Sequence, residues 1–300
     1  MSNMSLNLVV LAAWMWSRYW GLKQLDTFWS WHHALMEYSV YDAKRAWFDK
    51  VIFVIRKSFE EEFKEKIGKK IEQFITVDYA FQDMNGLPSG FVCPETREKP
   101  WGTWHAVLSA KDYIDWPFAV INADDFYGRE SYEVIANFLK SNDKNAIVWY
   151  KISEVLSDYW TVSRGMCELN PQWELIAIHE TKKIYKKDWS IFADREDWTS
   201  FEINANELCS MNMMWFRLDS LWYYERYFKE FLEKNINDPK IEFYMPEVIT
   251  RLINEEWEHV PVLPTSAQWF WVTYQEDKEN TNKSIDKLIE EWLYPMNLRE

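Results

Sequence analysis

The first apolar run of the chain constrains its fold more than any other stretch. It reads Leu8-Val9-Val10-Leu11-Ala12-Ala13. An unbroken run of this kind near the N-terminus, ended by small residues, is typical of the first buried strand of a parallel sheet. A basic loop that contains Arg18 and Lys23 follows it. Because ligands of open α/β sheets bind at the carboxyl ends of the strands, we expect this loop to lie at the ligand-binding edge.

Alternating helical and strand-like patterns continue over the first half of the chain. They predict helices over 34–46, 59–70, 103–113 and 131–140, and strands over 51–55, 75–82, 118–122 and 146–151. These alternating steps imply an α/β fold with a Rossmann-like, doubly wound, mostly parallel sheet and right-handed crossovers. A long loop over 83–101 interrupts the pattern, and loops of that length inside a compact domain are usually functional.

The second half of the chain changes character. Short strands over 161–169 and 174–179 predict a hairpin, which begins a small β-rich insertion over 160–206 that covers the ligand edge. A strand over 210–216 is then expected to return to the main sheet. The remaining patterns predict helices over 218–232, 246–253 and 284–293 and strands over 260–263 and 270–274. We interpret 1–300 as a single domain, because 300 residues suffice for one large α/β core.

The bulk composition argues against several classes of partner. The formal net charge is −14, so a basic face that binds nucleic acid is not expected. The three cysteines are far apart in the sequence, which fits a reducing cytoplasm better than a disulfide framework. The sequence shows neither a secretory signal pattern nor an apolar run of about 18 residues. We therefore expect a cytoplasmic chain without a membrane partner, and its oligomeric state stays open.

The opening stretch resembles that of the sugar-1-phosphate nucleotidyltransferases, also called NDP-sugar pyrophosphorylases. Their signature is a strand, two alanines, a glycine-x-glycine-x-arginine loop and a lysine a few residues later. Arg18 and Lys23 fall at the matching basic positions. Pro100-Trp101-Gly102-Thr103 looks like the family segment that meets the nucleobase, and Asp124 ends a buried strand as the family's metal ligand does. The resemblance runs from residue 8 to about residue 274 and implies a fold of the nucleotide-diphospho-sugar transferase type.

The resemblance also implies an activity. The enzyme would join a nucleoside triphosphate to a sugar-1-phosphate, or to a similar phosphate, and would release pyrophosphate with Mg²⁺ as cofactor. Such a transfer needs the acceptor phosphate in line with the α-phosphorus and cations that offset the charge of the leaving pyrophosphate. Arginine suits bidentate contacts with phosphate, and lysine supplies a point charge.

The residues that the resemblance assigns to the site fall into four groups. They are the catalytic residues Arg18 and Lys23, the nucleotide-binding residues Ala12, Ala13, Gln82, Gly102 and Thr103, the sugar-phosphate-binding residues Glu180, Lys182 and Asn212, and the metal ligand Asp124. A glutamine such as Gln82 can read a pyrimidine edge through one donor and one acceptor. A strand-end carboxylate such as Asp124 can hold Mg²⁺ that bridges phosphates. Thr181 departs from the family by interrupting its usual Glu-Lys pair.

Tryptophan and glycine are used in unusual proportions. The chain has 20 Trp and only 7 Gly, whereas about 7% of residues in ordinary proteins are glycine. Trp14 and Trp16 stand where the phosphate loop of the family needs glycine. Trp104 and Trp160 occupy small-residue positions that we expect to lie beside the base and the sugar. Trp173 follows Asn170-Pro171-Gln172, a turn context that favours glycine.

These positions lead to the hypothesis that most of the tryptophans stand at former glycine positions. Only Trp101 and Trp269 occur in contexts where tryptophan is expected. Glycines in a phosphate loop let backbone N–H groups approach the ligand, so tryptophans there would weaken nucleotide binding or abolish activity. The replacement could arise through engineering, corruption or mis-recording of the chain. An intact mass equal to that of the printed sequence would show that the tryptophans are physically present, and a lower mass would show that they are not.

Two other classes of function are open. A glycosyltransferase that uses a nucleotide sugar shares the acidic strand end but does not explain Arg18 and Lys23. A non-catalytic carbohydrate-binding module could use exposed tryptophans as stacking platforms. The released product separates the two enzymes, because a nucleotidyltransferase releases pyrophosphate and a glycosyltransferase releases a nucleoside diphosphate.

Overall fold

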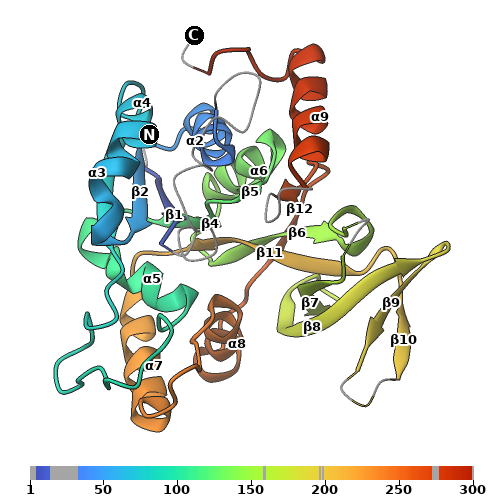
Figure 1. Cartoon of the computed structure of the whole chain (residues 1–300). Coiled ribbons are helices and arrows are strands. Elements are labelled where there is room, and N and C mark those ends of the chain that lie inside the picture. Colours follow the sequence, from blue (N-terminus) through green and yellow to red (C-terminus); the bar gives the residue numbers. More distant parts are fainter. Residues whose placement is uncertain are drawn as a thin grey trace.

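The computed structural model (Figure 1) describes residues 5–13, 33–157, 160–195, 197, 199–271 and 277–298. For 277–280 it describes only the backbone. The predicted phosphate loop, with Trp14, Trp16, Arg18 and Lys23, lies outside the described residues.

The parallel half of the main sheet is built from the apolar runs of the first half of the chain. Its strands pair in the order β3-β2-β1-β4, and each pair is parallel. Their bounds are Asn7–Leu11 for β1, Lys50–Ile55 for β2, Thr76–Phe81 for β3 and Phe118–Asn122 for β4. β1 is buried along its whole length, as its unbroken apolar run predicts. The carboxyl ends of four strands therefore meet at one edge of the sheet.

Strand β11 (Leu208–Phe216) joins this parallel half to an antiparallel half. It runs antiparallel to β4, to β6 and to β7, and β12 pairs in parallel with β6. A separate two-stranded sheet pairs β5 with β13. The bounds are Asp125–Phe126 for β5, Ala146–Lys151 for β6, Val262–Pro264 for β12 and Phe270–Trp271 for β13. The predicted α/β class with a mostly parallel central sheet is confirmed.

The predicted β-rich segment forms an arm at the other end of the same sheet. Its strands pair successively as antiparallel neighbours, and Figure 1 shows that they project away from the helices. They are β7 (Val162–Leu169), β8 (Leu175–Lys187), β9 (Ser190–Asp194) and β10 (Ser200–Ile203). β8 is much longer than the strand predicted over 174–179, because it also pairs with β9. The division into one domain with an insertion stays a prediction.

Helices cover both faces of the sheet (Figure 1). One core cluster receives α2 and α6, together with the helical turns of 57–71, whereas the opposite cluster receives α5, α7 and α8. The bounds are α2 Leu35–Arg45, α3 Glu60–Phe63, α4 Lys69–Ile71, α5 Thr103–Ser109, α6 Arg129–Leu139, α7 Ser220–Asn235, α8 Met245–Glu256 and α9 Asp277–Glu290. Helix α9 packs with α2 and β13 in a third, smaller cluster. None of the helices in the described ranges is long and apolar enough to cross a membrane.

A buried carboxyl group lies beside this third cluster. We expect it to make the free energy of unfolding depend on pH. Asp42 is 1% exposed and accepts a hydrogen bond of 2.5 Å from the Tyr294 hydroxyl. Burial raises the pKa of Asp42 to about 8 from its ordinary value of 3.8. The folded chain therefore holds a proton that the unfolded chain has lost between pH 4 and pH 8, so the free energy of unfolding falls as pH rises through that window.

We expect Asp42→Asn to remove this pH dependence, because an amide oxygen can still accept the hydrogen bond from Tyr294. The stability of the variant relative to the parent should rise by up to about 1.4 kcal/mol for each pH unit within the window. Urea unfolding at several pH values between 4 and 9 measures the difference. Parallel curves for the two proteins would contradict the burial argument.

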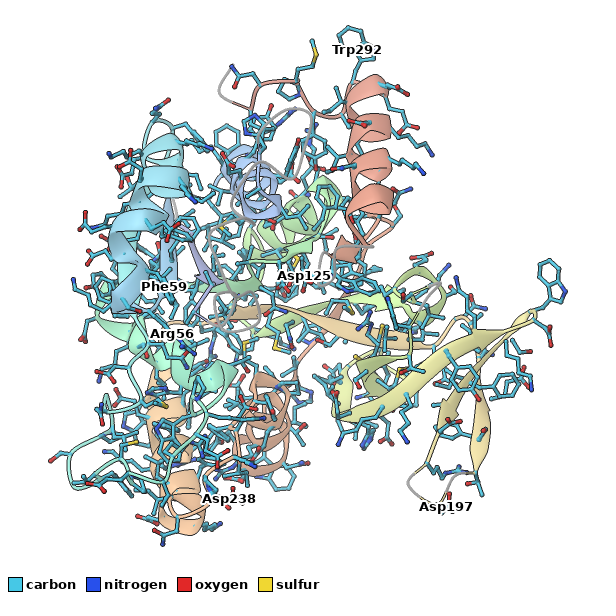
Figure 2. The ribbon with its side chains drawn as sticks, in the orientation of Figure 1. Arg56, Phe59, Asp125, Asp197, Asp238 and Trp292 are labelled. Carbon is cyan, nitrogen blue, oxygen red and sulfur yellow. The ribbon has the colours of Figure 1, made fainter. Side chains whose placement is uncertain are left out.

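Four tryptophans have left-handed backbone conformations. Among the described residues, seven non-glycine residues have positive φ, and they include Trp47, Trp173, Trp257 and Trp292. Trp257 follows α8 at φ 56°, where a C-terminal glycine is common, and the N–H of Glu258 donates to the carbonyl of Leu252. The Trp292 side chain, after α9, is 93% exposed and points away from the molecule in Figure 2. Bulky residues rarely adopt positive φ, and glycine does so readily. The hypothesis that such tryptophans stand at glycine positions stays a prediction.

Candidate functional site

Two adjoining cavities lie at the carboxyl ends of the parallel strands. The larger, the β3-side cavity, has a volume of about 380 Å³ and is lined by Ala13, Gln82, Gly102 and Thr103 among others. The smaller, the β7-side cavity, has a volume of about 240 Å³ and is lined by Asp124, Arg164 and Glu180 among others. Asn122 and Asn212 line both. The topology thus gathers residues from distant parts of the sequence into one elongated site.

The β3-side cavity is shaped by a close backbone approach at Gly102. Gly102 has φ +102°, and a Cβ there would lie 2.3 Å from the carbonyl oxygen of Phe243. The Trp104 N–H donates to that same oxygen at 3.1 Å. Only glycine fits this contact, because a side chain would clash with backbone. Thr103, the first residue of α5, accepts a 3.1 Å hydrogen bond at Oγ1 from the Met245 N–H and so ties α5 to the start of α8.

The β7-side cavity contains a pair of neighbouring carboxyl groups with different surroundings. Asp125 is buried, and its Oδ2 accepts hydrogen bonds from Asn122 Nδ2 at 2.9 Å and from the Tyr127 hydroxyl at 3.1 Å. Burial raises the pKa of Asp125 to about 6, although both hydrogen bonds oppose the rise. Asp124 is half-buried and lines the same cavity. Figure 2 shows Asp125 near the centre of the molecule, close to where the helical part and the β-rich arm meet.

Asn212 marks the junction of the two cavities because the backbone of β11 is irregular there. The pairing of β11 with β6 shifts register between Ser210 and Met214. Asn212 has φ +61°, and its N–H donates to Ser210 Oγ at 3.3 Å. Such bulges bend a strand and re-aim a side chain, and they are frequent beside active sites. The strand thus presents Asn212 to both cavities instead of continuing its regular alternation.

Glu180 and Lys182 occupy successive outward positions of β8, and the structure separates them. Glu180 lines the β7-side cavity, opposite Gly165 in the register of β7 and β8. Lys182 is exposed and lines neither cavity. The assignment of Lys182 to the sugar phosphate stays a prediction.

Arg164 is a cavity residue for which the sequence gives no signal. Its guanidinium donates two hydrogen bonds to the Val155 carbonyl, from Nε at 3.1 Å and from Nη2 at 2.6 Å. It also lies over the rings of Trp269 and Trp271, 4.9 and 5.0 Å from their centroids. Burial lowers the pKa of Arg164, but an arginine stays charged in proteins. The cavity therefore combines one fixed positive charge with acidic groups.

The structure also gives the positions of the two alanines and of two tryptophans named from the sequence. Ala12 is fully buried and lines neither cavity, whereas Ala13 lines one. The expectation that Trp104 crowds the base is wrong, because this side chain is fully buried in the core against Phe216 and Tyr224. Trp160 is 50% exposed and is not among the residues that line the β7-side cavity, so it does not face the sugar position there.

The donor atoms at the site are oxygens. No group of three or more His, Cys, Asp or Glu side chains with the geometry of a metal site occurs in the described residues. Asp124, Asn122 and Asn212 nevertheless offer one carboxylate and two amide oxygens around the junction of the cavities. Mg²⁺ accepts this kind of set, because it is commonly held by one or two carboxylates together with substrate phosphates and water.

Comparisons with known proteins give one family match and several structures of similar fold. Residues 23–164 match the family described as nucleotidyl transferase. No curated protein matches the sequence significantly. The structure resembles a protein from Bacillus anthracis assigned as a glucose-1-phosphate thymidylyltransferase and solved with sucrose, at 11% identity and a TM-score of 0.63 over 93% of this chain and 95% of that one.

Two other solved structures share the fold. A UDP-glucose pyrophosphorylase complexed with UDP-glucose is 14% identical, with a TM-score of 0.61 over 95% of this chain and 99% of that one. The inositol-1-phosphate CTP transferase from T. maritima is 11% identical, with a TM-score of 0.59 over 96% of this chain and 97% of that one. The predicted fold type is confirmed, and the family match over residues 23–164 agrees with the resemblance to nucleotidyltransferases.

Proposed function

We propose, on the premise that this chain is a nucleotidyltransferase in sequence and fold, that it joins a nucleoside triphosphate to a sugar-1-phosphate or a similar phosphate and releases pyrophosphate. The observation that carries the proposal is the pair of adjoining cavities that share Asn122 and Asn212. The nucleoside would occupy the β3-side cavity, and the acceptor would occupy the β7-side cavity.

This arrangement suits an in-line displacement at phosphorus. An oxygen of the acceptor phosphate attacks the α-phosphorus of the triphosphate, and the bond from that phosphorus to the bridging oxygen breaks as pyrophosphate leaves. The protein contributes chiefly position and charge. We propose that Arg18 and Lys23, which lie outside the described residues, offset the charge of the leaving group. The guanidinium of Arg164 supplies positive charge on the acceptor side.

Mg²⁺ would be held by Asp124 with help from the amide oxygen of Asn212. When bound, the ion would supply positive charge that offsets the charge of the phosphate oxygens. Asp125 has a different part in this proposal, because its Oδ2 is already engaged by Asn122 and Tyr127. Its contribution is to fix the end of β4, and hence the position of Asp124.

The proposal is tested by pyrophosphate release with Mg²⁺, four nucleoside triphosphates and a pool of sugar phosphates. We expect release from a version with Gly at 14, 16, 104 and 160, and little or none from the chain with tryptophan there. A version with Gly only at 14 and 16 is the informative comparison, because Trp104 and Trp160 line neither cavity. We expect it to be at least as active as the fourfold version, because removal of the buried Trp104 side chain leaves a cavity in the core.

Nucleotide sugars are tested as donors in parallel. Release of a nucleoside diphosphate from them, without pyrophosphate release from triphosphates, would favour a glycosyltransferase instead. Absence of both activities in every version would overturn the proposed function.

A further inference from the structure

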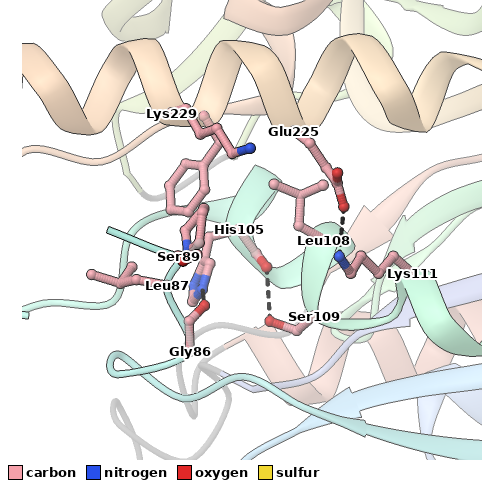
Figure 3. Close-up of a pocket in the computed structure, with 11 residues that line it drawn as sticks. Gly86, Leu87, Ser89, His105, Leu108, Ser109, Lys111, Glu225 and Lys229 are labelled. Atoms are coloured by element: carbon pink, nitrogen blue, oxygen red, sulfur yellow. Dashed lines mark hydrogen bonds and ion pairs between the residues drawn. The ribbon is translucent and has the colours of Figure 1, made fainter. Parts of the chain in front are cut away.

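His105 lies beside Gln82, the residue that the family resemblance assigns to the nucleobase. It is in helix α5, is 2% exposed, and stacks on Phe228 with ring centroids 5.1 Å apart and an interplanar angle of 25°. One edge of its ring faces a cavity of about 310 Å³ on the outer side of α5, shown in Figure 3. The other edge faces Gln82, which lines the β3-side cavity. The imidazole therefore lies between the cavity on the outer side of α5 and the β3-side cavity.

The hydrogen-bonding roles of the two ring nitrogens follow from their neighbours. Nε2 lies 3.2 Å from the carbonyl oxygen of Gly86, which can only accept (Figure 3). Nε2 therefore carries the hydrogen, and in a neutral ring Nδ1 is left with its lone pair. Burial lowers the pKa of His105 to about 4, so the ring is neutral at ordinary pH. Nδ1 is thus an acceptor that faces Gln82.

The amide of Gln82 has only one orientation that satisfies its neighbours. Its Nε2 lies 3.1 Å from the carbonyl oxygen of Gly102 and 3.4 Å from His105 Nδ1. With the amide reversed, its oxygen would face two acceptors, which is repulsive. Both N–H groups of the amide therefore donate hydrogen bonds within the protein. The described residues give Oε1 no hydrogen bond, so this acceptor is left for a ligand.

We propose that His105 is a positioning residue, which holds the Gln82 amide so that Gln82 presents only its acceptor to the nucleobase and selects uracil or thymine over cytosine. This inference rests on the proposed function and changes one expectation from the sequence. Gln82 does not offer a donor and an acceptor, because the donor is already used. Uracil and thymine carry N–H at ring position 3 and match an acceptor placed there, whereas cytosine has a lone pair at that nitrogen and can donate only from its 4-amino group.

The fold does not decide the base by itself. The structures that share it include one described as a CTP transferase and one complexed with UDP-glucose. A choice between these bases must come from side chains and their orientation, as the hydrogen bonds of Gln82 illustrate.

The test uses two substitutions of His105 in the version with Gly at 14 and 16. In parallel, calorimetry measures nucleotide binding by the chain as printed. His105→Phe keeps a ring that can stack on Phe228 and removes both nitrogens. His105→Gln can still accept from Gln82 and donate to Gly86. We expect the parent to favour UTP or dTTP over CTP, His105→Phe to lower that kcat/KM ratio by about tenfold or more, and His105→Gln to retain most of it.

The outcomes separate this inference from the proposed function. Loss of the preference in His105→Phe at unchanged thermal stability, with turnover of CTP maintained, supports the positioning role. An equal loss of activity towards every triphosphate would show a merely structural role and overturn the inference. A parent that prefers CTP would also overturn it while leaving the proposed function intact. If no nucleotide is turned over by any version or bound by the printed chain, both fail together.

Discussion

Replacement of Asp124 by Asn should lower the rate of pyrophosphate release by about 100-fold or more, with the remaining activity requiring more Mg²⁺. An amide is a much weaker ligand for Mg²⁺ than a carboxylate, and the charge that builds up on the phosphate oxygens in the transition state would lose part of its compensation. Steady-state rates over a Mg²⁺ titration give both quantities. The fold should be unaffected, because Asp124 is half-buried and lines a cavity.

The neighbouring residue supplies the matched control. Asp125→Asn also removes a carboxylate, and its amide oxygen can still accept from Asn122 and Tyr127. We expect its dependence on Mg²⁺ to stay close to that of the parent. If Asp125→Asn shifted the Mg²⁺ requirement and Asp124→Asn did not, the assignment of the metal ligand within this pair would be reversed.

Replacement of Trp47, Trp173, Trp257 and Trp292 together by Gly should stabilise the protein by several kcal/mol. Each side chain is at least 62% exposed and has positive φ, so its loss costs little packing and relieves backbone strain. The relief is about 1 kcal/mol per site, or about 4 kcal/mol in all, after part of it is offset by the greater freedom of glycine in the unfolded chain. Urea unfolding measures the sum.

An exposed tryptophan with ordinary helical geometry tests the explanation. Trp222 is 63% exposed and lies in helix α7, outside the set of residues with positive φ. Trp222→Gly should destabilise the protein by roughly 0.5 to 1 kcal/mol, because glycine is unfavourable inside a helix. A stabilising effect at Trp222, or a destabilising one at the four left-handed positions, would show that relief of backbone strain is not the cause of the change in stability.

The sequence predicted the parallel half of the fold well because the signals there are local. The run from Leu8 to Ala13 is apolar at every position, and a strand buried on both faces needs that pattern. The same locality placed Asp124 at the end of β4 and Gly102 at the start of α5. Of the residues named from the family resemblance at these strand ends, Ala13, Gln82 and Asp124 line the cavities and Ala12 does not, and their roles stay predictions.

The parts that the sequence missed depend on partners far away in the chain. The length of β8 follows from its pairing with β9, and the tip between them contains Asp188 with φ 55°. Arg164 reaches the site through a stack with Trp269, more than a hundred residues later. The orientation of Gln82 depends on the tautomer of His105, which in turn depends on the carbonyl of Gly86. No local pattern reports such relations.

The left-handed backbone at the four tryptophans also bears on how the gene is translated. The tryptophan codon UGG differs from a glycine codon only in its first base, and so does UGA, which some translation systems read as an amino acid. A cell that decodes UGA as glycine and UGG as tryptophan would place glycine at each of these turns that UGA encodes, and it would keep Trp101, whose indole donates to the Met84 carbonyl at 2.9 Å, if UGG encodes that residue. Peptide sequencing of the protein from its native source decides this, because tryptophan found at residues 47, 173, 257 and 292 would exclude such a code.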